Sequence, residues 1–285
     1  MDVLLLVLEL LLLGFGAGTL VSMTGLGGGI LMIPAMVLLL GLPTKAAIGS
    51  TVIAVVATSS AAAVVYAERH ITNLRLGMFL EMFTTIGGVS GTIITIFLSP
   101  NILNGIFSIF MLYAALYLLW RRDCVPPEGL PVEGQCDQDR LALACEFRDE
   151  VLGREIHYAP KRLTWGSAIS FVAGSLSGML GVGGGIIKVP MMNAIMKVPM
   201  KAAAATSNFM IGVTAVASAY IYYTRGYVVP LLTGPVVVGI LLGSILGSTL
   251  VAKRLSGDAI RKIVVVLLLV SSFTMMLKAT GSLPY

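Results

Sequence analysis

Long runs of apolar residues, separated by short polar breaks, organise almost the whole chain. They form two groups of five, and the second run of each group is shorter than the others. A helix needs about 20 apolar residues to cross a bilayer, whereas a run of roughly 10–14 is typical of a half helix or a re-entrant segment. The predicted segments are 3–22, 28–41, 46–67, 75–98 and 101–120, then 163–180, 186–196, 202–223, 228–251 and 260–280.

The two groups are copies of one unit, because the sequence repeats itself at a fixed offset. The stretch GLGGGILMIP at 25–34 returns as GVGGGIIKVP at 181–190, with six identities in ten positions and an offset of 156 residues (181 − 25). At the same offset, LPTKAAIGST at 42–51 corresponds to VPMKAAAATS at 198–207. This divides the chain into a first transmembrane repeat, a polar connector and a second transmembrane repeat: 1–120, 121–162 and 163–285.

Composition places this pattern in a membrane. Of the 285 residues, 57% are hydrophobic and 12% are charged, whereas a typical soluble domain has about 25% charged residues. A formal net charge of +5 would suggest a nucleic-acid partner for a soluble protein, but here we attribute it to positive cytoplasmic loops and expect no nucleic acid. The predicted fold class is an all-α polytopic membrane protein, multi-pass in the lipid bilayer of the cell (inner) membrane.

The distribution of Lys and Arg predicts how the two repeats are oriented. If the first two segments of a unit form a pair that returns to its own side, each unit makes an odd number of crossings and the second copy is inverted. One face then carries fifteen Lys and Arg residues, and the other carries only Lys45, Arg225 and Lys278. If the pair makes one broken crossing instead, the copies run parallel and the charges mix. Because cytoplasmic loops are the positive ones, we predict inverted-topology repeats, a cytoplasmic connector and both termini outside.

The connector also holds the three cysteines, Cys124, Cys136 and Cys145. Their odd number argues against a closed set of disulfides, and the absence of a C-x-x-C pair gives little support to a zinc site. A cytoplasmic connector lies in a reducing compartment, so we expect free thiols. We expect neither a metal site nor a bound cofactor.

Glycine-rich stretches that open a helix are also found in nucleotide sites. A dinucleotide fingerprint requires an acidic residue about 20 positions on, but the expected region around Thr44, Lys45 and Ala46 has none, and no G-K-[ST] loop is present. In a membrane, glycine permits a tight reversal of the backbone, and a half helix that begins there presents free N–H groups and a positive dipole end. Interruptions at matching places in two halves of a chain indicate a transporter's binding site.

We therefore predict an anion site near the membrane midplane, where the two half-helix ends converge. Hydroxyl and amide groups at the start of each third segment would add hydrogen bonds to an oxyanion, and Lys188 would supply a positive charge. The predicted binding residues are Gly25, Gly27, Gly28, Gly29, Ser50, Thr51, Gly181, Gly183, Gly184, Gly185, Lys188, Thr206, Ser207 and Asn208.

Each of these assignments has an alternative explanation. Glycines also let helices pack closely, which we favour for Gly87 and Gly91. Ser and Thr can bond their own helix carbonyls, and Lys188 can extend its side chain to the membrane surface. Two carboxylates also lie within apolar runs, Glu9 and Glu81, for which we favour interfacial positions or pairing over proton transfer. Aromatic residues expected at the membrane surface are Trp120, Trp165, Tyr113, Tyr117 and Tyr158.

The doubled motif resembles the TSUP family, the TauE/SafE-type sulfite exporters that are also called toluene sulfonate uptake permeases. The resemblance rests on GLGGGILMIP and GVGGGIIKVP, each followed by a Pro-x-Lys-Ala stretch and a small polar cluster, and it covers both repeats outside 121–162. It implies secondary transport of a small sulfur-containing anion, such as sulfite or a sulfonate like sulfoacetate, with export as the direction.

We expect alternating access between the two repeats, and a homodimer is left open. An anion channel that uses the same half-helix ends is the alternative function. We do not expect an enzyme, because the sequence offers no Ser–His, Cys–His or His–Glu constellation: the two histidines, His70 and His157, fall in predicted cytoplasmic loops.

Overall fold

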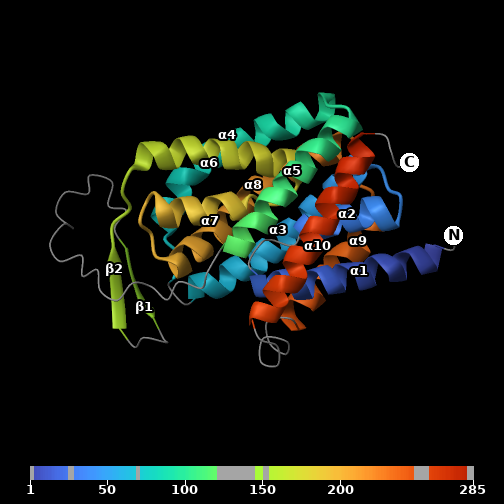
Figure 1. The fold of residues 1–285 in the computed structure, drawn as a ribbon. Helices are drawn as coiled ribbons and strands as arrows, with labels where there is room; N and C mark the ends of the chain where they lie inside the picture. Colours follow the sequence, from blue (N-terminus) through green and yellow to red (C-terminus); the bar gives the residue numbers. More distant parts are fainter. Residues whose placement is uncertain are drawn as a thin grey trace.

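Helices make up nearly all of the computed structural model, which describes residues 3–24, 29–68, 71–120, 145–149, 154–246 and 257–280 (Figure 1). The helices of the first repeat are α1 (Val3–Thr24), α2 (Gly29–Leu39), α3 (Thr44–Glu68), α4 (Leu74–Phe97) and α5 (Pro100–Trp120). Those of the second are α6 (Leu163–Leu180), α7 (Gly185–Ala194), α8 (Met200–Thr224), α9 (Pro230–Leu246) and α10 (Gly257–Ala279). Each predicted segment corresponds to one of these helices, so the predicted polytopic helical fold is confirmed.

Length and hydropathy distinguish the spanning helices from the short ones. Within the described residues, six helices contain a stretch long and apolar enough to cross a membrane. These stretches are Thr44–Val64, Leu74–Phe97, Pro100–Trp120, Leu163–Leu180, Ala202–Thr224 and Lys262–Ala279. The second helix of each repeat is short, with 11 residues in α2 and 10 in α7. Neither of these two helices could cross a bilayer alone.

A small antiparallel hairpin lies in the connector, where the sequence analysis predicted no strand. It consists of β1 (Cys145–Asp149) and β2 (Arg154–Tyr158), with Cys145 opposite Tyr158 and Asp149 opposite Arg154. The segments CEFRD and REIHY alternate between apolar and polar residues over part of their length, which is a strand pattern. The hairpin stands apart from the helices in Figure 1. The other two connector cysteines, Cys124 and Cys136, lie outside the described residues.

Helices pair across the two repeats in an arrangement that repeats itself. The first helix of each unit packs along the fourth of the other, α1 with α9 and α6 with α4, while α3 packs with α8 and α5 with α10. Two close glycine contacts follow the sequence offset: a Cβ on Gly87 would collide with the carbonyl oxygen of Phe171, and a Cβ on Gly243 would collide with that of Phe15. These glycines therefore serve close helix packing, as we favoured for Gly87.

The turns after the two short helices lie at opposite ends of the helical body. At one end, Lys45 Nζ donates to the carbonyl of Ile96 at 2.8 Å, and Lys278 Nζ donates to that of Val37 at 3.2 Å. These two hydrogen bonds bring the end of α2, the start of α3 and the ends of α4 and α10 close together. At the other end, the backbone N–H of Lys161 donates to Met196, just beyond α7. The hairpin lies at this second end in Figure 1, opposite both chain termini. Which end faces the cytoplasm stays a prediction.

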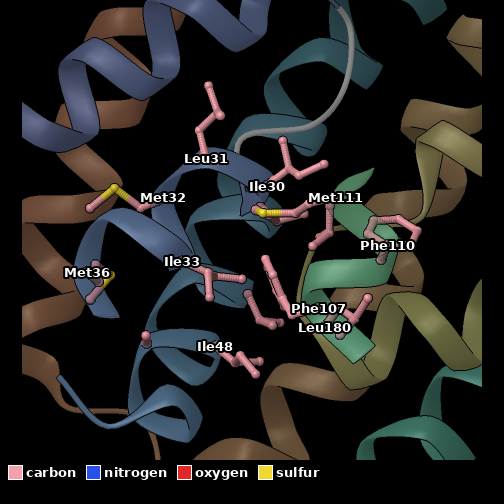
Figure 2. Close-up of a cluster of buried hydrophobic side chains, with 14 of the residues drawn as sticks. Ile30, Leu31, Met32, Ile33, Met36, Ile48, Phe107, Phe110, Met111 and Leu180 are labelled. Atoms are coloured by element: carbon pink, nitrogen blue, oxygen red, sulfur yellow. The ribbon is translucent and has the colours of Figure 1, made fainter. Parts of the chain in front are cut away.

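The short helix α2 lies inside the largest apolar core. Its residues from Gly29 to Pro34 are buried, and so are Met36 and Val37. Figure 2 shows the side chains of Ile30 and Ile33 close to those of Phe107 and Met111 from α5. Because an 11-residue helix cannot span the bilayer, this packing holds its broken end within the protein, where irregular backbone is tolerated.

Candidate functional site

The second glycine turn, between α6 and α7, has a backbone that only glycine adopts easily. Gly181, Gly183 and Gly184 have φ values of 65°, 87° and 70°, in the left-handed region that costs other residues about 1–2 kcal/mol each. Gly184 is the N-cap of α7 and supplies no side-chain hydrogen bond to it. The first N–H groups of a helix have no acceptor inside that helix, so the start of α7 offers N–H donors and a positive dipole end.

The C-terminal end of α6 is held in place before this turn. The hydroxyl of Tyr222 donates to the carbonyl of Gly178 at 2.8 Å, and Thr92 Oγ1 donates to the same oxygen at 3.2 Å. Thr95 Oγ1 donates to the carbonyl of Met179 at 3.3 Å. Carbonyls at the end of a helix lack partners within it, so these hydroxyls from α4 and α8 fix the position of the glycine turn.

The start of the short helix α2 lies against the glycine turn that precedes α7. A Cβ on Gly29, the first residue of α2, would lie 2.5 Å from the carbonyl oxygen of Gly181 and 3.2 Å from the Cα of Val182. The start of α2 therefore packs directly on the turn that precedes α7. Of the predicted first glycine cluster, Gly25, Gly27 and Gly28 lie outside the described residues, so only Gly29 is placed here.

A small gap adjoins this meeting point. It is lined by the second glycine turn and by one face each of α3, α6 and α8: Val52, Val55, Ser177, Gly181, Gly183, Ala215 and Ser218. The gap that these described residues leave is too small for a water molecule. Ser218 Oγ is nevertheless buried, and it has no hydrogen-bond partner among the residues that the structure describes. A buried hydroxyl without a partner is costly, so the gap contains a polar atom that an entering ligand could satisfy.

Next to the turn lies a buried polar network that includes Lys188. This lysine is in the first turns of α7 and its side chain has 0% exposure, so the alternative that it reaches the membrane surface is wrong. Its Nζ lies 3.4 Å from Thr214 Oγ1, which lies 2.7 Å from Glu81 Oε1. Thr214 precedes Ser218 by four residues, so the two hydroxyls share a face of α8 about 6 Å apart along the helix.

The predicted hydroxyl residues have different partners. Thr51 Oγ1 donates to its own helix carbonyl at Ala47, at 2.7 Å, as the alternative explanation held. Thr206 Oγ1 accepts from the backbone N–H of Asn73 at 3.1 Å and so ties α8 to the start of α4. Ser50 Oγ and Ser207 Oγ are both buried with no hydrogen-bond partner among the described residues. Ser207 lies near Gly185, where a Cβ would stand 3.7 Å from its Oγ. Asn208 is partly exposed.

The two hydroxyl clusters lie on opposite sides of the point where α3 and α8 cross. Helices α3 and α8 run in opposite directions, since Gly49 near the start of α3 lies against Tyr227 just after α8. They cross where Gly212 faces Ser59. At about 1.5 Å per residue, Ser50 lies roughly 13 Å from this crossing on one side and Ser207 roughly 7 Å on the other. Ser207 lies beside the second glycine turn at Gly185, and the same turn touches Ile48 and Val52, which flank the first cluster on α3.

Sequence reasoning missed part of the central network. Thr214 and Ser218 lie seven and eleven residues after Ser207, and this spacing puts all three on one face of a helix. That polar stripe in an otherwise apolar segment is a signal that could have found them. Tyr158, expected at the membrane surface, is 5% exposed and packs in the second apolar core with Met196 and Val198. Trp120 and Trp165 are exposed, as expected of interfacial aromatics.

Comparison with known proteins identifies the family. The model of the family described as "Sulfite exporter TauE/SafE" matches residues 10–275. The chain belongs to the TauE/SafE sulfite exporter family. It is 26% identical over 268 residues to the probable membrane transporter protein YunE of Bacillus subtilis, which covers 92% of this chain and 94% of that protein. It is also 26% identical over 236 residues to the probable membrane transporter protein MJ0441 of Methanocaldococcus jannaschii, covering 80% and 77% of the two chains.

A shorter match covers one part of the chain. It is 32% identical over 99 residues to a probable membrane transporter protein of Xylella fastidiosa, covering 34% of this chain and 38% of that protein. No solved structure matches the chain. The TauE/SafE match spans both repeats, and the chain is a multi-pass protein of a membrane transporter family.

Proposed function

We propose that this TauE/SafE protein is a secondary transporter that exports a small sulfur-containing anion, either sulfite or a sulfonate such as sulfoacetate. The observation that carries the proposal is the contact of Gly29, at the start of α2, with Gly181 in the turn before α7, together with buried Lys188 in the first turns of α7. Helix N-termini attract anions through their free N–H groups and dipole. A buried ammonium adds a full positive charge, which favours an anion over a neutral solute.

The binding residues that we propose lie near the second glycine turn and have hydrogen-bonding groups without a partner among the described residues. The N–H groups at the start of α7, around Gly185, would bind the oxyanion, and Ser207 Oγ and Ser218 Oγ would add hydrogen bonds that they lack among the described residues. Lys188 would balance the negative charge. The equivalent N-terminus of α2, with Gly25, Gly27 and Gly28, belongs to the same proposal.

Alternating access follows from the way in which the repeats are joined. In this proposal the two units are inverted repeats, because corresponding turns lie at opposite ends and helices pair across the units at the sequence offset. Rocking one repeat against the other would then open the central gap to each end in turn. An anion channel that uses the same half-helix ends stays the alternative.

Transport into proteoliposomes tests this function. Purified protein would be assayed for uptake of labelled sulfite, sulfoacetate, methanesulfonate, taurine and sulfate, with and without the same solute preloaded inside. We expect saturable uptake of a negatively charged sulfur compound and acceleration by the preloaded solute, because a carrier returns faster when loaded. Linear uptake without saturation would favour the channel. No uptake of any of these compounds would overturn the proposed substrate class.

A further inference from the structure

A carboxylate is buried in the first third of a spanning helix, next to the proposed anion site. Glu81 is the eighth residue of α4 and is 5% exposed, so its side chain is enclosed by protein. Three threonine hydroxyls bind it. Thr214 and Thr85 donate to Oε1 at 2.7 and 2.8 Å, and Thr84 donates to Oε2 at 2.7 Å. An ionisable group held this way inside a membrane protein is expected to serve function.

Among the described ionisable residues, Lys188 is the one that the hydrogen-bond network connects to this carboxylate. Its Nζ reaches Thr214 at 3.4 Å, and Thr214 binds Glu81, so one hydroxyl separates the two charges. Helix α6, which packs along α4, has no ionisable side chain. On α8, the buried Tyr222 instead binds the end of α6, while Tyr220 and Tyr223 are exposed. Arg75, on α4 itself, is exposed near the helix start.

These two charges balance one another only while the anion site is empty. A negative solute that binds at Lys188 would leave two negative charges and one positive charge in a buried region of low dielectric constant, which is unfavourable. Uptake of one proton by Glu81 would restore the balance. We propose that Glu81 is the proton-coupling site of this transporter, so that one proton moves with each singly charged anion. This inference rests on the proposed function.

The threonines around Glu81 can accommodate both of its protonation states. A hydroxyl hydrogen can turn from one acceptor to another. Thr84 Oγ1 lies 3.1 Å from the carbonyl of Leu80, and Thr214 Oγ1 lies 3.0 Å from that of Met210. When Glu81 is protonated, these hydroxyls can donate to the helix carbonyls instead. A threonine hydroxyl oxygen can then accept a hydrogen bond from the new O–H of Glu81. The proton comes from hydronium on the entry side, leaving water, and returns to water on the exit side when the anion leaves.

Coupled flux in proteoliposomes tests the inference. The probe is methanesulfonate, whose charge stays at −1 throughout the neutral pH range, with a pH-sensitive dye enclosed in the vesicles. We expect uptake of methanesulfonate to acidify the interior and to accelerate when the outside is more acidic. In Glu81→Gln, we expect methanesulfonate flux that no longer responds to the pH gradient. Glu9→Gln is the matched control, because it removes another carboxylate from an apolar helix without touching this network.

Binding provides a second measurement that does not depend on a variant. Calorimetric titration of wild-type protein with methanesulfonate, in two buffers of different ionisation enthalpy, gives the number of protons taken up per anion. We expect about one, and an affinity that rises about tenfold for each pH unit of acidification while Glu81 is charged in the empty protein. Flux or binding of methanesulfonate without proton uptake would overturn the coupling alone. No binding or flux of methanesulfonate, with none for the other sulfur anions, would overturn the proposed function as well.

Discussion

Gly29 of the first repeat and Gly181 of the second are in direct backbone contact, because a Cβ on Gly29 would stand 2.5 Å from the carbonyl oxygen of Gly181. The two residues are 152 positions apart in the chain (181 − 29). Each borders the break that separates a long helix from a short one. The start of α2 therefore packs on the turn that ends α6 and precedes α7.

Replacing Gly29 tests this contact. We expect Gly29→Ala to reduce transport at least tenfold, because the added methyl group has to push the start of α2 away from the Gly181 backbone. The assay is proteoliposome uptake at equal amounts of inserted protein. Gly16→Ala, on α1, is the control, since a Cβ there would meet nothing within 4 Å. Full transport by Gly29→Ala would show that the contact is not needed.

Two glycines with similar backbone angles allow the effect of backbone strain to be distinguished from the effect of a steric clash. Gly184 has φ 70° and Gly226 has φ 74°, so alanine should destabilise both by about 1–2 kcal/mol through the backbone. A Cβ on Gly184 would also lie 3.0 Å from both the Ala173 carbonyl oxygen and Ser177 Cβ, whereas one on Gly226 would meet nothing within 4 Å. We expect Gly184→Ala to show the larger loss of thermal stability and to be alone in losing transport. Equal effects in the two variants would remove the special role of the Gly184 turn.

Ser207 and its neighbour Thr206 distinguish a binding hydroxyl from a structural one. Ser207 Oγ has no partner in the described structure, so Ser207→Ala should leave stability unchanged or slightly higher while it lowers affinity for the anion. Thr206 Oγ1 accepts from Asn73, so Thr206→Val should cost about 1 kcal/mol of stability. Thermal unfolding in detergent and the concentration for half-maximal uptake measure the two effects. Unchanged uptake in Ser207→Ala would exclude this hydroxyl from the site.

Lys188 should control affinity for the anion. We expect Lys188→Met to raise the anion concentration needed for half-maximal uptake by tenfold or more, because a full positive charge beside the site is lost and the volume is kept. Lys161→Met is the control, since Lys161 is an exposed cation just before α6. An unchanged uptake curve would limit Lys188 to balancing Glu81. Increased salt should weaken the wild-type interaction only slightly, because buried charges are screened less than exposed ones.

The helices could be predicted well because each depends on local sequence. A run of apolar residues long enough for the bilayer is sufficient to indicate a spanning helix, and the short runs after each glycine cluster indicated α2 and α7. The approach of the two half-helix starts stays a prediction, while the structure places the start of α2 against the turn before α7. The relative position of the two hydroxyl clusters could not be predicted, because the crossing point of α3 and α8 at Ser59 and Gly212 depends on packing between distant helices.

The surroundings of individual side chains could not be predicted either, because they also depend on packing between distant helices. From the sequence, Lys188 could either face a binding site or extend to the membrane surface, and Glu81 could lie at an interface. Both are buried because α7 and α8 bring Lys188 and Thr214 to the face of α4 that carries Glu81. Those contacts join residues as far apart in the chain as Glu81 and Thr214, which no local pattern connects.

The sequence by itself determined where the described helices lie, the duplication at an offset of 156 residues, and the two glycine-rich interruptions. These features follow from hydrophobic length and from the backbone freedom of glycine, which are properties of short segments. The tertiary structure alone decided which polar groups are buried together and which hydroxyls remain without partners. Those outcomes depend on where α3, α4, α7 and α8 cross, and helix crossings are set by the packing of side chains from both repeats.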